Sequence, residues 1–133
     1  MIVSIIAIMS NQKICPVEDT LNFFNRKWTL CILMDMFLGS KHFSEFKQSN
    51  PSLSNHILSN TLQDLVDKGL IEKIIKTSSK NSTEYRLTSK GLKVNKILYE
   101  LASYSFDELE LSKLQDYTKK DILNQYKDAL NVN

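Results

Sequence analysis

The feature that most constrains the fold is a stretch at residues 28–38 that is apolar on nearly every side of a helix. Its sequence, WTLCILMDMFL, contains a single charged residue, Asp35. A helix that is hydrophobic all round is normally the buried centre of a small bundle. Gly39 follows and is expected to end this helix. Other amphipathic elements of the chain must therefore surround it.

Length and composition fit one soluble domain. The chain has 133 residues, 42% of them hydrophobic, which is enough to bury a core and excludes a disordered chain. Three Gly and two Pro disfavour a loop-rich all-β fold. Two cysteines, Cys15 and Cys31, are too few for a disulfide scaffold and are compatible with thiols in a reducing cytosol, so we expect a cytoplasmic protein.

Apolar periodicity predicts further helices on both sides of the central one. They are expected at residues 16–25 with Pro16 in the first position, at 45–49 capped by Ser44, at 55–68 capped by Ser54, and from 89 through 104 capped by Thr88. Gly69 is placed to end the third of these helices in the left-handed conformation.

Two β-like runs, residues 71–76 and 83–87, flank a polar loop at 77–82 and predict a hairpin. The resulting order is helix, helix, short helix, turn, longer helix, hairpin, helix. This order predicts a mainly α fold with a small β-hairpin, the winged helix-turn-helix with flanking dimerisation helices. In such a fold the helix at 55–68 faces the major groove of DNA, and the hairpin reaches the backbone or the minor groove.

The formal net charge of +2 hides an uneven distribution of charge. Residues 1–40 are neutral, and residues 41–99 carry ten Lys and Arg against five acidic residues. Residues 100–133 carry four Lys against seven acidic residues. The basic middle indicates an anionic partner, although a solvated surface would look similar.

Several short motifs, collinear over about residues 14–106, resemble the HxlR-type winged helix-turn-helix regulators, a MarR-like group. They are Cys15-Pro16-Val17-Glu18, Lys27-Trp28, Phe43-Ser44-Glu45-Phe46, Leu58-Ser59-Asn60-Thr61-Leu62, Lys68-Gly69-Leu70-Ile71 and Glu84-Tyr85-Arg86-Leu87-Thr88 with Gly91. The resemblance implies a homodimeric, DNA-binding transcriptional regulator that responds to a small molecule or an oxidant.

The chain departs from that family pattern at two places. Asn25-Arg26 stands where relatives often have Gly-Gly, and residues 54–67 contain no Lys or Arg. Neutralisation of DNA phosphates must therefore come mostly from outside this helix. Asn and Gln side chains suit adenine edges, whereas Arg suits guanine.

The candidate DNA-binding residues fall into two groups. On the helix they are Ser54, Asn55, His56, Ser59, Asn60 and Gln63, and on the hairpin they are Lys73, Lys76, Lys80 and Arg86. A merely solvated helix face usually carries Lys and Glu, so an uncharged polar face favours contact with double-stranded DNA. The alternative for the hairpin is that its cations are only solvated.

Cys15 is a candidate redox sensor. It precedes Pro16 at the start of a helix, where the helix dipole favours a thiolate. The resemblance allows oxidant or electrophile sensing, and the alternative is a half-buried structural thiol. Cys31 is expected to lie within the apolar helix and to be inert. Two histidines and two cysteines without paired spacing predict no metal site, and no cofactor is expected.

We expect three segments along the chain: a leader at 1–13, a winged helix-turn-helix domain at 14–106 and an acidic helical extension at 107–133. The apolar start, MIVSIIAIMS, is too short to span a membrane, so we expect no membrane association. Either Met9 is the physiological start, or residues 1–8 form an arm that packs on the domain or on a partner subunit.

The sequence separates three classes of function. No catalytic signature is present, which argues against an enzyme. A DNA-binding regulator is expected, with a winged-helix protein-interaction module as the alternative. The first helix and the helix after the hairpin carry surplus apolar surface and predict a homodimer. The tail is expected to wrap the partner subunit, and the rival interpretation folds it back onto its own core.

Overall fold

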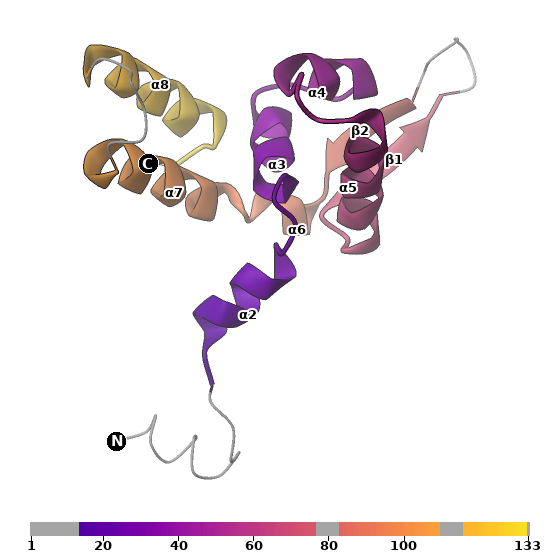
Figure 1. Ribbon diagram of the computed structural model, residues 1–133, viewed down its shortest axis with the longest axis horizontal. Helices are drawn as coiled ribbons and strands as arrows, with labels where there is room; N and C mark the ends of the chain where they lie inside the picture. Colours follow the sequence, from indigo (N-terminus) through magenta and orange to yellow (C-terminus); the bar gives the residue numbers. More distant parts are fainter. Residues whose placement is uncertain (1–13, 77–82, 110–115, 133) are drawn as a thin grey trace.

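The computed structural model describes residues 14–76, 83–109 and 116–132. Within them the elements are α2 (Pro16–Phe23), α3 (Thr29–Phe37), α4 (Phe43–Ser49), α5 (Asn55–Asp67), β1 (Ile71–Ile75), β2 (Thr83–Leu87), α6 (Ser89–Leu92), α7 (Asn95–Glu108) and α8 (Asp116–Ala129). The predicted fold class is confirmed, since this is a mainly α chain with a two-stranded hairpin (Figure 1).

Helix α3 is the centre of the core, as its apolar sequence predicts. Ile32 and Leu33 are fully buried, and they belong to one cluster with Phe46 of α4 and Leu58 of α5. The helix ends at Phe37, and Gly39 just beyond it has a φ of 114°, a conformation that glycine adopts without strain. Cys31 is an exception to the expected burial. It is exposed, because α3 is covered on fewer sides than its composition suggests.

Helices α4 and α5 form the helix-turn-helix. Ser54 caps α5 as predicted, and its hydroxyl accepts a hydrogen bond from the Ile57 amide at 3.1 Å. The prediction that Ser44 caps the short helix is wrong. The helix begins two residues earlier, at Phe43 with His42 as N-cap, because the Glu45 carboxylate accepts the His42 amide at 2.9 Å.

The hairpin and α6 continue the fold from α5. Strands β1 and β2 pair antiparallel, with Ile71 opposite Leu87, and Gly69 before them has a φ of 75°. Thr88 caps α6, accepting the Gly91 amide at 3.1 Å. The helix predicted from residue 89 to 104 is broken into α6 and α7. A Cβ at Gly91 would collide with the Leu70 carbonyl, and the chain then turns so that Val94 enters the core.

The C-terminal helix α8 folds back along α7 of its own chain (Figure 1). Leu130, just after it, is 1% exposed and belongs to the central cluster, and Tyr126 packs against that cluster. Tyr126 and Leu130 therefore fold back onto the core of the same chain, as the rival interpretation expects, and contact of the tail with a partner subunit stays a prediction. In the described ranges no helix has the length and apolar character needed to cross a bilayer.

Helix α2 projects away from the rest of the molecule (Figure 1). None of its residues is buried. Its end is anchored by Phe23 and Phe24, which pack against the core, and by Lys68, whose ammonium donates to the Phe23 carbonyl at 2.5 Å. The remainder of α2 therefore presents its side chains to solvent.

Candidate nucleic-acid interface

The outer face of α5 presents polar, uncharged side chains to solvent. Leu58, Leu62 and Leu65 bury the opposite face in the core, which fixes the rotation of the helix. The helix candidates Ser54, Asn55, His56, Ser59, Asn60 and Gln63 are all exposed. The structure therefore brings these six predicted residues together on one side of a single, well-anchored helix.

Two side-chain hydrogen bonds order this face. The Asn60 amide Nδ2 lies 3.2 Å from His56 Nε2, one helical turn earlier. The Gln63 amide donates to the Asp67 carboxylate at 2.8 Å, one turn later. Each of these amides thus uses one N–H within the helix and keeps its carbonyl oxygen and its second N–H.

Ile57 is an apolar residue of this helix that is not buried. It is 45% exposed, at the margin of the outer face. The helical spacing of residues 57, 58, 62 and 65 suggested burial, but α5 covers the core with a narrower stripe than the sequence predicts. An apolar side chain therefore lies beside the polar residues of the outer face.

The hairpin contributes cations next to the helix-turn-helix. Lys73 on β1 is exposed, and Arg86 on β2 lies 3.8 Å from Glu72 across the hairpin. Lys76 follows β1, and its ammonium lies 2.9 Å from the Glu84 carboxylate. Lys80 lies outside the described residues. The described part of the hairpin thus combines cations with local carboxylates.

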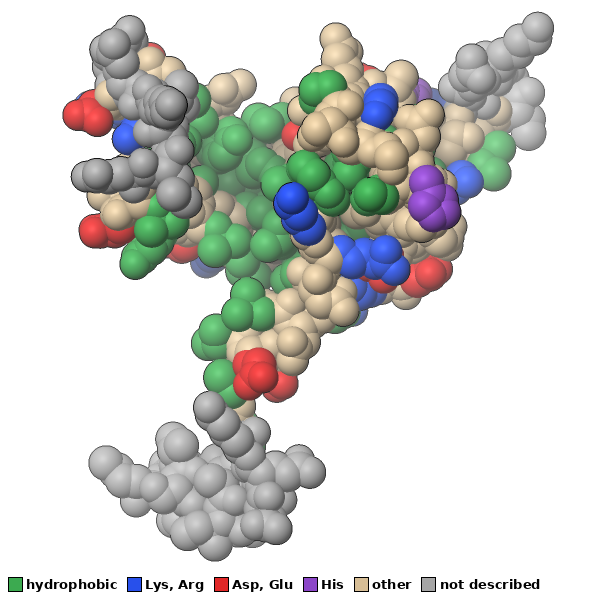
Figure 2. All heavy atoms as spheres, in the orientation of Figure 1, with side chains coloured by type: hydrophobic (Ala, Val, Ile, Leu, Met, Phe, Trp, Pro, Cys, Tyr) green, Lys and Arg blue, Asp and Glu red, His purple; other side chains and the backbone are tan. Residues whose placement is uncertain are grey.

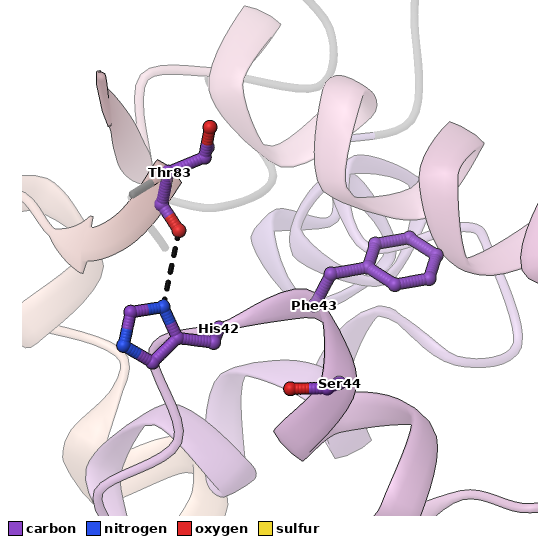
Figure 3. A pocket seen from close by; sticks show the side chains of 4 residues that line it. All are labelled: His42, Phe43, Ser44 and Thr83. Carbon is purple, nitrogen blue, oxygen red and sulfur yellow. Dashed lines mark hydrogen bonds between the residues drawn. The ribbon is translucent and has the colours of Figure 1, made fainter. Parts of the chain in front are cut away.

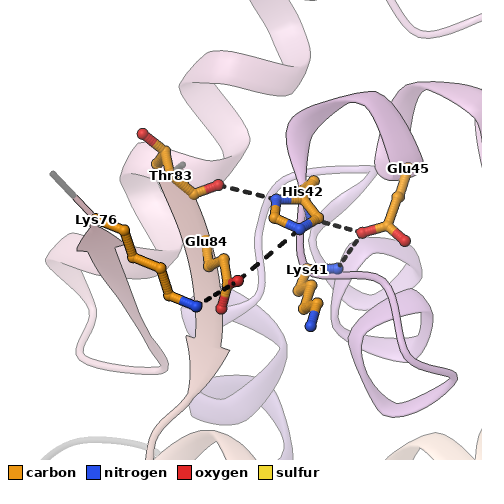
Figure 4. Close-up of polar contacts among 6 residues, drawn as sticks. All are labelled: Lys41, His42, Glu45, Lys76, Thr83 and Glu84. Atoms are coloured by element: carbon orange, nitrogen blue, oxygen red, sulfur yellow. Dashed lines mark hydrogen bonds and ion pairs between the residues drawn. The ribbon is translucent and has the colours of Figure 1, made fainter. Parts of the chain in front are cut away.

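A polar network that sequence reasoning missed ties the hairpin to the start of α4 (Figure 4). The Tyr85 amide donates to the Lys41 carbonyl at 2.8 Å, and His42 Nδ1 lies 3.1 Å from the Thr83 carbonyl. The Glu84 carboxylate lies 4.0 Å from His42 Nε2. These contacts fix the base of the hairpin relative to the helix-turn-helix.

The carboxylates of this network are held in their charged forms. The hydrogen bond from Lys76 lowers the pKa of Glu84, and Lys41 and His42 add smaller electrostatic contributions. The backbone amides of Lys41 and His42 lower the pKa of Glu45. No sequence signal could have paired His42 with Thr83, because 41 positions separate them and only the strand register joins them.

A pocket of about 450 Å³ lies beside this network (Figure 3). It is lined by His42, Phe43 and Ser44 at the start of α4 and by Thr83 at the start of β2. In the figure the His42 ring points toward Thr83, while Phe43 points away toward the helices. The pocket thus marks the junction of wing and helix-turn-helix.

A second group of cations lies where α2 meets α5, and Figure 2 shows Lys and Arg side chains gathered there. Lys68 Nζ lies 2.9 Å from the Asp64 carboxylate, and Arg26 Nε lies 3.7 Å from the same oxygen. Both cations lie near the C-terminal end of α5, so the cationic surroundings of the helix come from other elements, as its sequence requires.

The two cysteines occupy different environments. Cys15 is the N-cap of α2 and is partly buried. Cys31 is exposed overall, but partial burial of its thiol and then the nearby Asp35 carboxylate raise its pKa, which disfavours the reactive thiolate. Among the residues that the structure describes, no group of three His, Cys, Asp or Glu side chains could hold a metal ion.

A helix-turn-helix whose second helix is capped and exposed, followed by an antiparallel hairpin fixed to its base, defines the winged helix-turn-helix class of proteins. The sequence profile described as "HxlR-like helix-turn-helix" matches residues 23–113. The chain belongs to the HxlR-like helix-turn-helix family of transcriptional regulators.

Individual relatives agree with this assignment. The HTH-type transcriptional regulator YvaP of Bacillus subtilis is 28% identical over 105 residues, covering 78% of this chain and 97% of YvaP. The solved structure of the redox regulator HypR in its reduced form matches with a TM-score of 0.64 and 25% identity, covering 84% of this chain and all 100% of HypR. Reduced YodB from B. subtilis shares the fold, with a TM-score of 0.62 and 19% identity. The match covers 75% of this chain and 99% of YodB.

Proposed function

We propose that this protein is a transcriptional regulator that binds double-stranded DNA as a homodimer, with α5 in the major groove and the hairpin on the flanking backbone. The observation that carries the proposal is the outer face of α5, which is polar, uncharged and exposed while its opposite face is locked into the core. Base edges are neutral hydrogen-bonding groups, and a major groove admits one helix.

The electrostatic part of binding is assigned to the surroundings of α5. Lys73 and Arg86 on the hairpin and Arg26 beside α2 are exposed cations near that helix. Phosphate contacts orient a protein on the duplex, whereas base contacts specify sequence. This division of roles accounts for a recognition helix without cations.

A homodimer is part of the proposal because one short recognition helix gives little affinity. Helix-turn-helix dimers read two half-sites about one helical turn apart. Exposed apolar side chains suited to an interface lie on two helices: Val17 and Leu21 on α2, and Ile97, Leu101 and Tyr104 on α7. Exposed apolar surfaces of this kind mark interaction sites, and a second copy of the chain would cover them.

Duplex binding measured against salt tests the proposal directly. The full chain is titrated onto a labelled random-sequence duplex by fluorescence anisotropy at about 50 to 200 mM salt. A regulator should bind at low salt and lose affinity steeply as salt rises, because counterions are released from phosphates. Absence of binding at low salt would contradict the proposal and favour the protein-interaction module.

A response to oxidants is the narrower part of the proposal. Cys15 is partly accessible at the start of α2, the helix that projects toward a second subunit in the proposed dimer. The relative HypR is described as a redox regulator. Operator binding before and after oxidant treatment, in the parent protein, Cys15→Ser and Cys31→Ser, tests it. We expect loss of the response in Cys15→Ser alone, and a response retained in that variant would contradict it.

A further inference from the structure

We propose that the operator half-site of this protein presents an adenine to Asn60, with A·T pairs under the first two turns of α5. The inference rests on the proposed function and names the base that the same site recognises. It combines the hydrogen-bonding state of Asn60, the exposure of Ile57 and the engagement of both acidic side chains of the helix.

Asn60 is prepared to bind an adenine edge. Adenine offers one donor, N6–H, and one acceptor, N7, in the major groove, and the matching side chain needs one acceptor and one donor. Because Asn60 Nδ2 donates one of its hydrogens to His56 Nε2, at 3.2 Å, Oδ1 and the second N–H remain for a ligand. The hydrogen bond also restricts the rotamer of Asn60, which lowers the entropic cost of binding.

The helix carries no Lys or Arg for guanine, and each of its two acids already has a partner in the chain. Guanine presents two acceptors, N7 and O6, which Arg or Lys bind, and α5 contains neither. Cytosine presents a donor that Asp or Glu accepts. The two acids of α5 are already engaged: Asp64 with Lys68 at 2.9 Å and Asp67 with Gln63 at 2.8 Å.

Ile57 supplies an independent indication in favour of A·T pairs. Its side chain is 45% exposed in the first turn of α5, between the polar outer face and the side that carries the buried leucines. The thymine methyl group is the apolar feature of the major groove, and apolar side chains contact it there. An exposed isoleucine beside a free amide pair is therefore complementary to adenine and thymine together.

The experiment begins with selection of duplexes bound by the full chain from a random pool. We expect at least one position in each half-site to be almost invariably adenine. Replacing that adenine by 7-deazaadenine removes the N7 acceptor and should weaken binding about tenfold. Asn60→Ala should cause a similar loss with ordinary adenine and little further loss with the analogue. Asn60→Arg should move the preference at that position toward guanine.

Asn124→Ala is the matched control, because Asn124 is an exposed asparagine on α8, and it should leave the selected sequence unchanged. Thermal unfolding of each variant confirms that the fold is intact. Two outcomes would overturn the inference and leave the proposed function standing. One is guanine or cytosine at every specified position, and the other is an Asn60→Ala variant that binds duplex with an unchanged sequence preference. No duplex binding by the parent chain would overturn both.

Discussion

The side-chain amide of Asn95 donates a hydrogen bond of 2.8 Å to the backbone carbonyl of Leu130, joining the first residue of α7 to the residue that follows α8. The same Leu130 inserts its side chain into the core and is 1% exposed. The C-terminal segment is therefore part of the folded unit of its own chain. The charged residues of this segment lie on its outer surface, whereas its apolar side chains pack against the core.

The first prediction concerns the contribution of this segment to stability. Leu130→Ala removes a buried leucine side chain and should lower the free energy of unfolding by about 2–5 kcal/mol. Urea denaturation of the full chain measures the loss, and Asn124→Ala on the exposed face of α8 should change stability by less than about 0.5 kcal/mol. Equal effects of the two substitutions would show that the tail does not pack as described.

The second prediction separates affinity from sequence recognition. Lys73→Ala and Lys76→Ala should weaken binding to every duplex alike, each reducing the slope of log affinity against log salt by about 1. Asn60→Ala should instead weaken binding to the selected site and leave the salt slope unchanged. Lys120→Ala, a loss of the same charge on α8, is the control and should have little effect. Identical behaviour of the lysine and asparagine variants would contradict this division of roles.

The third prediction concerns pH and Asp35. Burial raises the pKa of this carboxyl above its ordinary value of 3.8, and the hydrogen bond from Asn50, at 2.7 Å, only partly opposes the rise. The folded chain therefore holds the proton more tightly than the unfolded chain. Stability from this group is present below the unfolded pKa and is lost as the pH rises through the folded pKa.

Asp35→Asn removes this titration and keeps an oxygen that can accept from Asn50. We expect the variant to be more stable than the parent at neutral pH, with the difference shrinking as the pH falls toward 3.8. Urea denaturation at a series of pH values measures it, with Asp128→Asn on α8 as the control for loss of one negative charge. A stability difference that is constant with pH would show that burial does not govern Asp35.

Local signals in the sequence predicted most of the fold. The caps formed by Ser54 and Thr88 depend on residues within three positions, and both are confirmed. The burial of α3 follows from its composition, because a chain of this size has few places other than its core for so apolar a helix. The order of elements follows from these local signals, and with it the fold class.

The features that local signals did not predict depended on contacts between distant segments. The break between α6 and α7 accompanies the burial of Val94, and the placement of α8 on its own chain accompanies the fit of Leu130 into the core. The exposure of Cys31 and Ile57 depends on which sides of α3 and α5 remain uncovered. Periodicity predicts which face of a helix is apolar, but it does not predict how much of that face other elements bury.

The last prediction concerns the homodimer. Within the described chain α2 buries none of its residues, and Val17 is 70% exposed although it is apolar. On α7 the side chains of Ile97, Leu101 and Tyr104 lie at helical spacing and are exposed. These two helices therefore offer apolar surface to a second subunit, and a C2 interface pairs each surface with its counterpart.

Leu101→Asp places a charge at the centre of the α7 surface. Because the dimer would bury an unpaired carboxylate in its interface, the variant should sediment as a monomer at micromolar protein concentration. Lys96→Asp changes the charge of α7 away from those three side chains and should leave the dimer intact. Both positions are exposed in the single chain, so thermal unfolding should show that each variant still folds. A monomeric parent protein at micromolar concentration, or a Leu101→Asp variant as dimeric as the parent, would exclude this interface. The monomer should also bind the selected operator far more weakly than the parent, since it engages one half-site at a time.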